Sequence, residues 1–150
     1  MKSLRRLAVW VAVLTAGSAI AAERKVAMQE LPAPVQEAVR EHTKGLMLVG
    51  LSEETENGET LYEAEVRANG RTWDILIDPT GKVITEEKEI SLSSLPEPAR
   101  AAIEQAAEGG TIKKLESVTK DGTTLYEAQI KKDGKKVEVV VAPDGTIQKN

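Results

Sequence analysis

The stretch TLYEAEVRANG occupies residues 60–70, and TLYEAQIKKDG occupies residues 124–134. Shifting the chain by 64 positions aligns residues 31–86 with residues 95–150 without a gap, and sixteen of the 56 pairs are identical. Turn glycines stay in register along the whole alignment, as in the pairs Gly58/Gly122 and Gly81/Gly145. A match of this length and regularity predicts an internal duplication.

The quoted stretches have the period of a β-strand. In residues 61–68, Tyr62, Ala64 and Val66 alternate with polar positions, and residues 125–132 repeat the pattern around Tyr126. Such alternation predicts a strand with one buried and one polar face. The dipeptides 69–70 (Asn-Gly) and 133–134 (Asp-Gly) predict two-residue hairpin turns. Both tyrosines are therefore expected in the core, with Trp73 on the same face of the next strand.

Each copy is expected to begin with a helix. Pro32 and Pro34 suit a first helical turn, where their missing N–H groups have no intrahelical partner. A strand then follows from Leu46 to about Glu56, and its broken alternation predicts a bulge near residues 49–50, repeated at residues 113–114. Short final strands are expected around Val83 and Ile147.

These elements together predict an α+β fold. It consists of two tandem helix-plus-antiparallel-sheet (αββββ) repeats, with the helices packed on one face of the sheet. Each copy alone is small for a stable core, so the strands are expected to form one continuous or nearly continuous sheet. The segment 86–94, charged and then serine-rich, is interpreted as the linker between the copies.

The first 21 residues have the pattern of a cleaved signal peptide. Lys2, Arg5 and Arg6 precede an apolar run of ten residues, and small residues at 19 and 21 suit a signal peptidase. The run is short for a permanent membrane anchor. The predicted organisation is a signal peptide at 1–21, repeats at 22–86 and 95–150, and a linker at 87–94. The predicted localisation is periplasmic or secreted, with no membrane association after cleavage.

Charge and composition exclude several functions. The signal peptide holds three of the 20 basic residues and none of the 24 acidic ones, so the mature part carries a net charge of −7. This balance argues against a nucleic acid or an anionic lipid as partner. The chain has no cysteine, which excludes disulfides, thiol catalysis and a lipidated cysteine.

The sequence predicts no enzyme, no cofactor and no metal site. The one histidine, His42, aligns with Ala106 in the second copy and has no second histidine to work with. No serine lies in a nucleophile motif, and phosphate-binding glycine motifs are absent. Glu63 and Glu127 are interpreted as part of a solvated strand face. The glutamates at 86, 87 and 89 are interpreted as a linker charge run, with weak divalent-cation binding left open.

The helix-free face of the sheet is the candidate surface for a partner. Strand alternation places apolar and acidic residues on it together, a mixture that suits a weak or transient protein contact more than a deep ligand pocket. The predicted contact residues are Leu61, Glu63, Asp74, Leu76, Leu125, Glu127, Glu138 and Val140.

Both copies resemble the PepSY-like domains, through the pattern LPxxVxxAV, a later YEaeV segment, and the turns dGr and DPtGkV. In the first copy the resemblance rests on Leu31, Pro32, Val35, Val39, Tyr62, Glu63, Val66, Gly70, Asp78, Gly81 and Val83. In the second copy it rests on Leu95, Pro96, Ile103, Tyr126, Glu127, Ile130, Gly134, Gly145 and Ile147. The resemblance implies an exported module whose tandem form is similar to the β-lactamase inhibitor protein (BLIP) fold. It also implies inhibition or chaperoning of hydrolases, and it brings no catalytic residues.

Three classes of function remain at this point. The first is a non-enzymatic binding or regulatory module that acts on an unknown periplasmic or secreted protein, such as a hydrolase. The second is a small-ligand or divalent-cation binder that uses the acidic sheet face. An enzyme of unrecognised type is the third.

Overall fold

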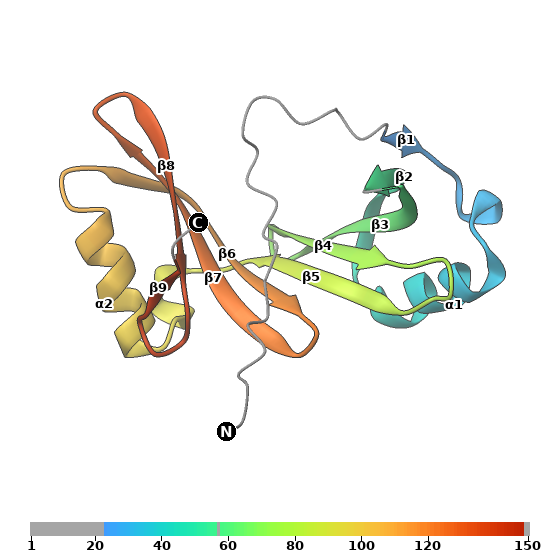
Figure 1. Ribbon diagram of the computed structural model, residues 1–150. Coiled ribbons are helices and arrows are strands. Elements are labelled where there is room, and N and C mark those ends of the chain that lie inside the picture. Colours follow the sequence, from blue (N-terminus) through green and yellow to red (C-terminus); the bar gives the residue numbers. More distant parts are fainter. Residues whose placement is uncertain (1–22, 57, 149–150) are drawn as a thin grey trace, which may run out of the picture.

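The computed structural model describes residues 23–148 except residue 57 (Figure 1). The predicted signal peptide and its cleavage site lie outside the described residues. The elements, in chain order, are β1 (Arg24–Lys25), η1 (Met28–Glu30), α1 (Ala33–His42), β2 (Met47–Glu56), β3 (Glu59–Ala68), β4 (Arg71–Ile77), β5 (Val83–Glu89), η2 (Leu92–Ser94), α2 (Glu97–Ala106), β6 (Thr111–Lys120), β7 (Thr123–Lys132), β8 (Lys135–Val141) and β9 (Ile147–Gln148). Neither α-helix in this part of the chain has the length and apolar composition that crossing a bilayer requires.

The strands form one antiparallel sheet of nine strands, in which each strand pairs with its neighbours in sequence. The expected continuous sheet is confirmed, and so is the α+β class. The two halves meet where β5 pairs with β6, from Thr85 opposite Lys120 to Glu89 opposite Glu116. Residues 86–89, expected to open the linker, are therefore strand residues, and the irregular connection is confined to the segment around η2.

Local sequence signals explain the hairpins and bulges. The tight turn between β3 and β4 has positive φ at Asn69 (54°) and Gly70 (78°), and the turn between β7 and β8 has the same conformation at residues 133–134. Two positive φ values in succession are the type I′ geometry that matches the twist of paired strands. The pairing register shifts between Leu48 and Gly50 and again between Ile112 and Lys114. Both predicted bulges are confirmed.

Both helices begin at a proline and pack on the same face of the sheet. Pro32 and Pro96 are the N-cap residues, and Val35, Val39 and Ile103 are fully buried on the inward sides of the helices. One row of the register runs across the sheet through Trp73, Lys88, Ser117, Tyr126 and Val141. Cross-strand neighbours share a face, so this row lies on the helix-bearing side in both halves.

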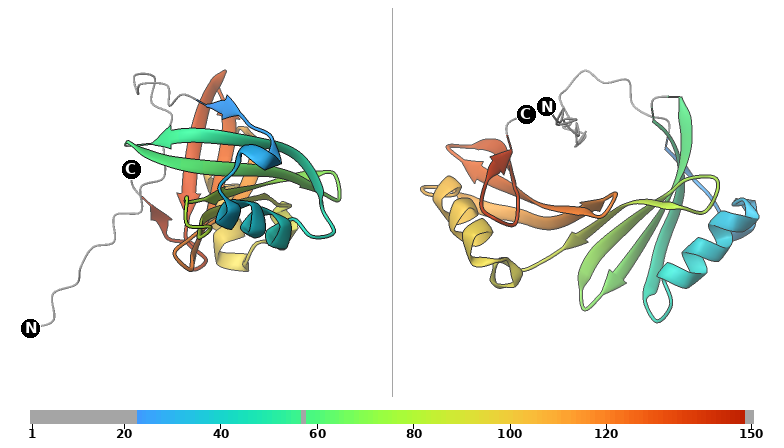
Figure 2. Two further views of the ribbon diagram at one scale, coloured as in Figure 1. Left: turned by 90° about the vertical axis from the view of Figure 1, so that its right-hand side faces the viewer. Right: turned by 60° about the horizontal axis from the view of Figure 1, so that its bottom comes forward.

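The apolar core is divided into two clusters, one under each helix. Tyr62 is buried in the first with Ala64, Ile75 and Ile77, while Tyr126 is half-buried and packs against the second. The expected core position of the tyrosines is confirmed. Between the clusters, Lys88 lies over the Trp73 ring at 4.0 Å from its centroid, and no helix covers β5. Figure 2 shows the sheet curving between the halves, with α1 and α2 on its outer side.

Candidate functional site

The inner, helix-free face contains all eight residues predicted for partner contact. The register places Glu63 opposite Leu76 and Glu127 opposite Val140, on the side of the sheet away from Tyr62 and Tyr126. This face is more sheltered than a flat solvated surface, because a curved sheet shields its concave side. Leu61, Leu125 and Val140 are buried there, although α1 and α2 both lie on the other face of the sheet.

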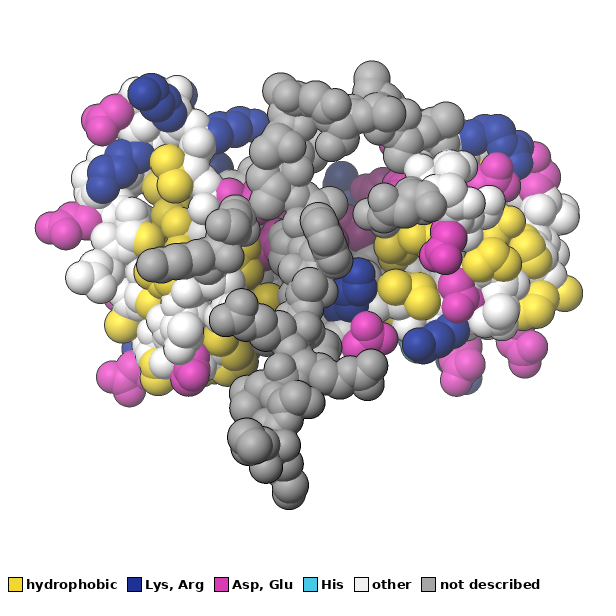
Figure 3. Space-filling view, viewed as in Figure 1, with side chains coloured by type: hydrophobic (Ala, Val, Ile, Leu, Met, Phe, Trp, Pro, Cys, Tyr) yellow, Lys and Arg dark blue, Asp and Glu magenta, His cyan; other side chains and the backbone are white. Residues whose placement is uncertain are grey.

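An acidic band crosses this face on six successive strands, and Glu65 on β3 and Glu89 on β5 lie on the same face beside it. We use the name acidic band for Glu63 on β3, Asp74 on β4, Glu87 on β5, Glu116 on β6, Glu127 on β7 and Glu138 on β8. In the strand register, Asp74 lies directly opposite Glu87, and Glu116 lies directly opposite Glu127. The other neighbours within the band are related diagonally, two residues apart in register. Acidic side chains are visible in the hollow between the two halves in Figure 3.

Burial and mutual repulsion change the acidity of the band. Burial raises the pKa of Glu63 to about 7, and the charges of Glu54 and Asp74 contribute. Burial also raises the pKa of Glu127 to about 7, with repulsion from Glu138 as the next cause. The pKa values of Asp74 and Glu87 are raised for the same first reason. Glu63 and Glu127 were expected on a solvated strand face, and the structure places both half-buried on that face, where they lose part of their hydration.

Lys114 lies within the acidic band and forms an ion pair with Glu116. Its Nζ is 2.6 Å from Glu116 Oε1, and the Glu116 residue is only 6% exposed. Burial alone would lower the pKa of Lys114, but the hydrogen bond to Glu116 and the charges of Asp74 and Glu87 raise it. The band thus already holds one ammonium group.

Two further features of the band bear on ligands. Carboxylate oxygens of Asp74, Glu87 and Glu116 all lie within 4.8 Å of one another, close enough for three oxygen ligands to a divalent cation. In addition, Glu127 Oε1 and Glu138 Oε1 are buried and accept no hydrogen bond from the described residues. A buried acceptor without a donor is costly unless a partner supplies one.

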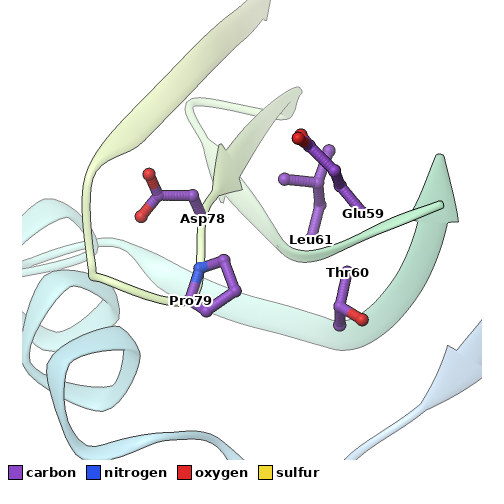
Figure 4. Close-up of a pocket in the computed structure, with 5 residues that line it drawn as sticks. All are labelled: Glu59, Thr60, Leu61, Asp78 and Pro79. Carbon is purple, nitrogen blue, oxygen red and sulfur yellow. The ribbon is translucent and has the colours of Figure 1, made fainter. Parts of the chain in front are cut away.

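Two shallow depressions lie among the described residues, and the larger of them is formed by β3 and the turn after β4. An open depression of about 400 Å³ is lined by Glu59, Thr60, Leu61, Asp78 and Pro79, with Glu59 and Leu61 pointing to one side of the strand (Figure 4). The Asp78 side chain stabilises the turn between β4 and β5, because its Oδ1 accepts hydrogen bonds from Thr80 N (2.8 Å) and Lys82 N (3.0 Å). His42 Nδ1 lies 4.0 Å from Glu86 Oε1 on the opposite, helix-bearing side.

Sequence reasoning missed Lys114 and Glu116, and it named Glu87 only in a linker charge run for which weak divalent-cation binding was left open. Glu87 was interpreted as part of a linker because β5 reads VITEEKE and has few apolar residues. Glu116 aligns with Ser52 of the first copy, and both residues are buried on the helix-free face. The repeat alignment with Ser52, just after the bulge in each copy, is the sequence signal that could have placed Glu116 on this face.

Comparisons with known proteins agree with the fold. Residues 35–87 match PepSY, the peptidase propeptide and YPEB domain. No curated protein is similar enough to the chain to count as a match. A DUF2874 family protein of Bacteroides ovatus has 17% sequence identity and a TM-score of 0.65, over 79% of this chain and 85% of that one.

Two other solved structures are similar. One, provisionally described as a periplasmic protein of Bacteroides eggerthii, has 16% identity and a TM-score of 0.68, over 79% of this chain and 86% of that one. A BLIP-like protein of Bacteroides fragilis has 18% identity and a TM-score of 0.62, over 79% and 84%.

The sheet with its two outer helices therefore defines an α+β domain of the BLIP-like type. Residues 35–87 match the PepSY domain, in agreement with the resemblance found in the first copy, and the solved structures support the same fold for the described chain.

Proposed function

We propose that this chain is an exported, non-enzymatic binding or regulatory module that contacts a protein partner through its helix-free face. The observation that supports it best is the face itself, where half-buried carboxylates and apolar side chains cover strands β3 to β8. A curved surface of this extent suits another protein better than a small molecule, which needs a more enclosed pocket.

The proposal extends to organisation and localisation. Residues 1–21 act as a signal peptide, 22–86 and 95–150 are tandem copies of one αββββ PepSY-like module, and 87–94 completes the connection. The mature protein acts in the periplasm or outside the cell, in agreement with the description of the Bacteroides eggerthii neighbour. A secreted or periplasmic hydrolase is the partner class that the BLIP-like fold favours, with inhibition as the effect.

Site-specific photocrosslinking in the cell that makes the protein tests this proposal. A photoreactive amino acid at Leu76 or Leu125 probes the helix-free face, and the same group at Glu37 or Glu104 on the exposed sides of α1 and α2 is the control. We expect a discrete crosslinked protein from the first pair of positions and none from the second. Equal crosslinking from both pairs, or none from Leu76 and Leu125, would contradict the proposal.

A second candidate function is divalent-cation binding, favoured by the convergence of Asp74, Glu87 and Glu116. Lys114 competes for the same site, because a cation at Glu116 must replace its ammonium group. If the chain binds calcium, millimolar calcium chloride will raise its melting temperature, and Asp74→Asn will abolish the increase. Glu104→Gln on α2 serves as the control of equal charge change.

A further inference from the structure

The acidic band has more negative charge than its ion pair with Lys114 neutralises, and Lys131 and Lys136 lie on the same face beyond its β7–β8 end. Its six carboxylates are half-buried or buried, and Lys114 pairs with one of them. Two oxygens at the β7–β8 end, Glu127 Oε1 and Glu138 Oε1, have no donor among the described residues. Partly desolvated acceptors of this kind gain most from a charged donor.

The geometry of the band fits an extended polypeptide. Six neighbouring strands at their usual spacing cover about 24 Å from β3 to β8. An extended segment of about seven residues has the same length, and alternate residues would direct three or four side chains toward the sheet. Leu61, Leu76, Leu125 and Val140 flank the carboxylates, and such apolar surface can cover the aliphatic part of a lysine or arginine side chain.

Lys114 shows which charge the band accepts. Its ammonium group lies at 2.6 Å from Glu116, and the hydrogen bond and charge of Glu116, followed by the charges of Asp74 and Glu87, raise the pKa of Lys114 against the effect of burial. The same chemistry is available on both sides of Lys114, at Glu63 on β3 and Glu127 on β7, whose pKa values are raised by burial and by neighbouring carboxylates. A cationic side chain beside Glu63 or Glu127 would offset the loss of hydration and the repulsion from neighbouring carboxylates, and would stabilise the charged form of the glutamate.

We infer that the acidic band binds a segment of the partner protein that is rich in lysine and arginine, laid in extended form across strands β3 to β8. This inference rests on the proposed function, because it assigns the chemistry of the partner to the same face. Charge complementarity between the carboxylates and the basic side chains selects the partner.

Peptide binding to the complete mature protein tests the inference. The probe is a labelled ten-residue peptide of alternating lysine and serine, and fluorescence anisotropy at low salt measures its Kd. The matched probes have glutamate or acetylated lysine in place of lysine. We expect binding of the lysine peptide alone, weakened by added salt. Equal binding of the acetylated peptide, or no binding of the lysine peptide, would overturn the inference.

Variants locate the site. Glu127→Gln with Glu138→Gln removes two charges from the band, and Glu97→Gln with Glu104→Gln removes two from the exposed side of α2. The band variant is expected to weaken peptide binding about tenfold and the control variant less than about twofold. Equal losses in the two variants would mean that net charge alone attracts the peptide, and the inference would fall.

The crosslinking experiment separates the two proposals. A crosslinked partner peptide without basic residues, identified by mass spectrometry from Leu76 or Leu125, would overturn the basic-segment inference and leave the proposed binding face intact. Failure to crosslink any protein from these positions would instead contradict the proposed function. A basic peptide at the crosslink supports both.

Discussion

At the scale of single residues, position in the sheet decides how a glutamate behaves. Glu63 and Glu127 occupy the same place in the two copies, and both are half-buried on the concave face. Glu97 and Glu104 are glutamates of the same intrinsic chemistry, exposed on α2. A partly dehydrated carboxylate beside other carboxylates holds its proton more strongly than an exposed one.

The first prediction is that the protein becomes less stable as the pH rises from about 5 to 8. In the folded chain the pKa values of Glu63 and Glu127 are about 7. The unfolded chain releases these protons near pH 4.3, so the folded state binds more protons in this window and higher pH favours unfolding. After discounting for solvent screening, the loss is about 1 kcal/mol per group.

Urea denaturation at several pH values measures this effect. The double variant Glu63→Gln with Glu127→Gln is expected to remove most of the pH dependence and to be more stable than the parent at pH 8. Exposed groups with lowered pKa values, such as Asp78 and Asp144, titrate below this window and do not disturb it. A stability that is constant between pH 5 and 8 would show that both carboxylates are fully solvated, and a stability that rises would also contradict their raised pKa values.

The second prediction concerns the two repeated tyrosines. Tyr62 is 8% exposed in the first core cluster, so Tyr62→Ala is expected to cost about 3 kcal/mol of stability. Tyr126 is only half-buried at the edge of the second cluster, so Tyr126→Ala is expected to cost less, about 2 kcal/mol. Chemical denaturation compares them, and a loss below about 1 kcal/mol at Tyr62 would contradict its position in the core.

At the scale of elements, the turn that follows β4 fixes the position of α1. A Cβ added to Gly81 would lie 2.7 Å from the carbonyl oxygen of Pro34, in the first turn of α1, and the φ of Gly81 is +88°. Gly145 has the same relation to Pro98 at the start of α2. The glycine therefore lets the turn touch the helix backbone, which holds the helix against the sheet.

The third prediction is that Gly81→Ala destabilises the protein by about 3 kcal/mol, from backbone strain and from the contact with Pro34. Gly70→Ala is the matched control, because Gly70 also has positive φ (+78°) but nothing lies within 4 Å of an added Cβ. The control is expected to cost about 1 kcal/mol, from strain alone. Equal losses in the two variants, measured by thermal and chemical denaturation, would mean that the close approach to α1 is unimportant.

The elements that sequence predicted well have strong local signals. The hairpin turns contain Asn-Gly or Asp-Gly, and both bulges interrupt the alternation at the same place in each copy. β5 lacks such signals because neither helix covers it, and its helix-side residues Glu86 and Lys88 pair with each other at 2.8 Å instead of packing in a core. The acidic band was only partly predictable for the same reason, since Glu87 lies on this strand and Glu116 interrupts the repeat.

At the scale of the whole molecule, β5 joins two cores that do not touch through their helices. It pairs with β4 on one side and with β6 on the other, so the sheet continues through the junction. Three of the six carboxylates of the acidic band, Asp74, Glu87 and Glu116, lie at this junction. The band therefore exists only when the two halves are assembled, and binding through it depends on the integrity of the complete sheet.

The last prediction is that the chain unfolds in one cooperative transition. Each half has about 60 residues, a size at which a single core without disulfides or metal is marginal. The pairing of β5 with β6 also covers two strand edges that would otherwise be open. Fragments 23–90 and 91–150, divided after β5, are therefore expected to be unfolded or aggregated when expressed separately, and mixing them should restore structure if the edges recognise each other.

Circular dichroism and tryptophan fluorescence should follow the same unfolding curve in the complete chain, since Trp73 reports on the first half and the backbone signal on both. Two separate transitions, or a fragment as stable as the complete chain, would show that the halves are independent domains that share a sheet without sharing stability.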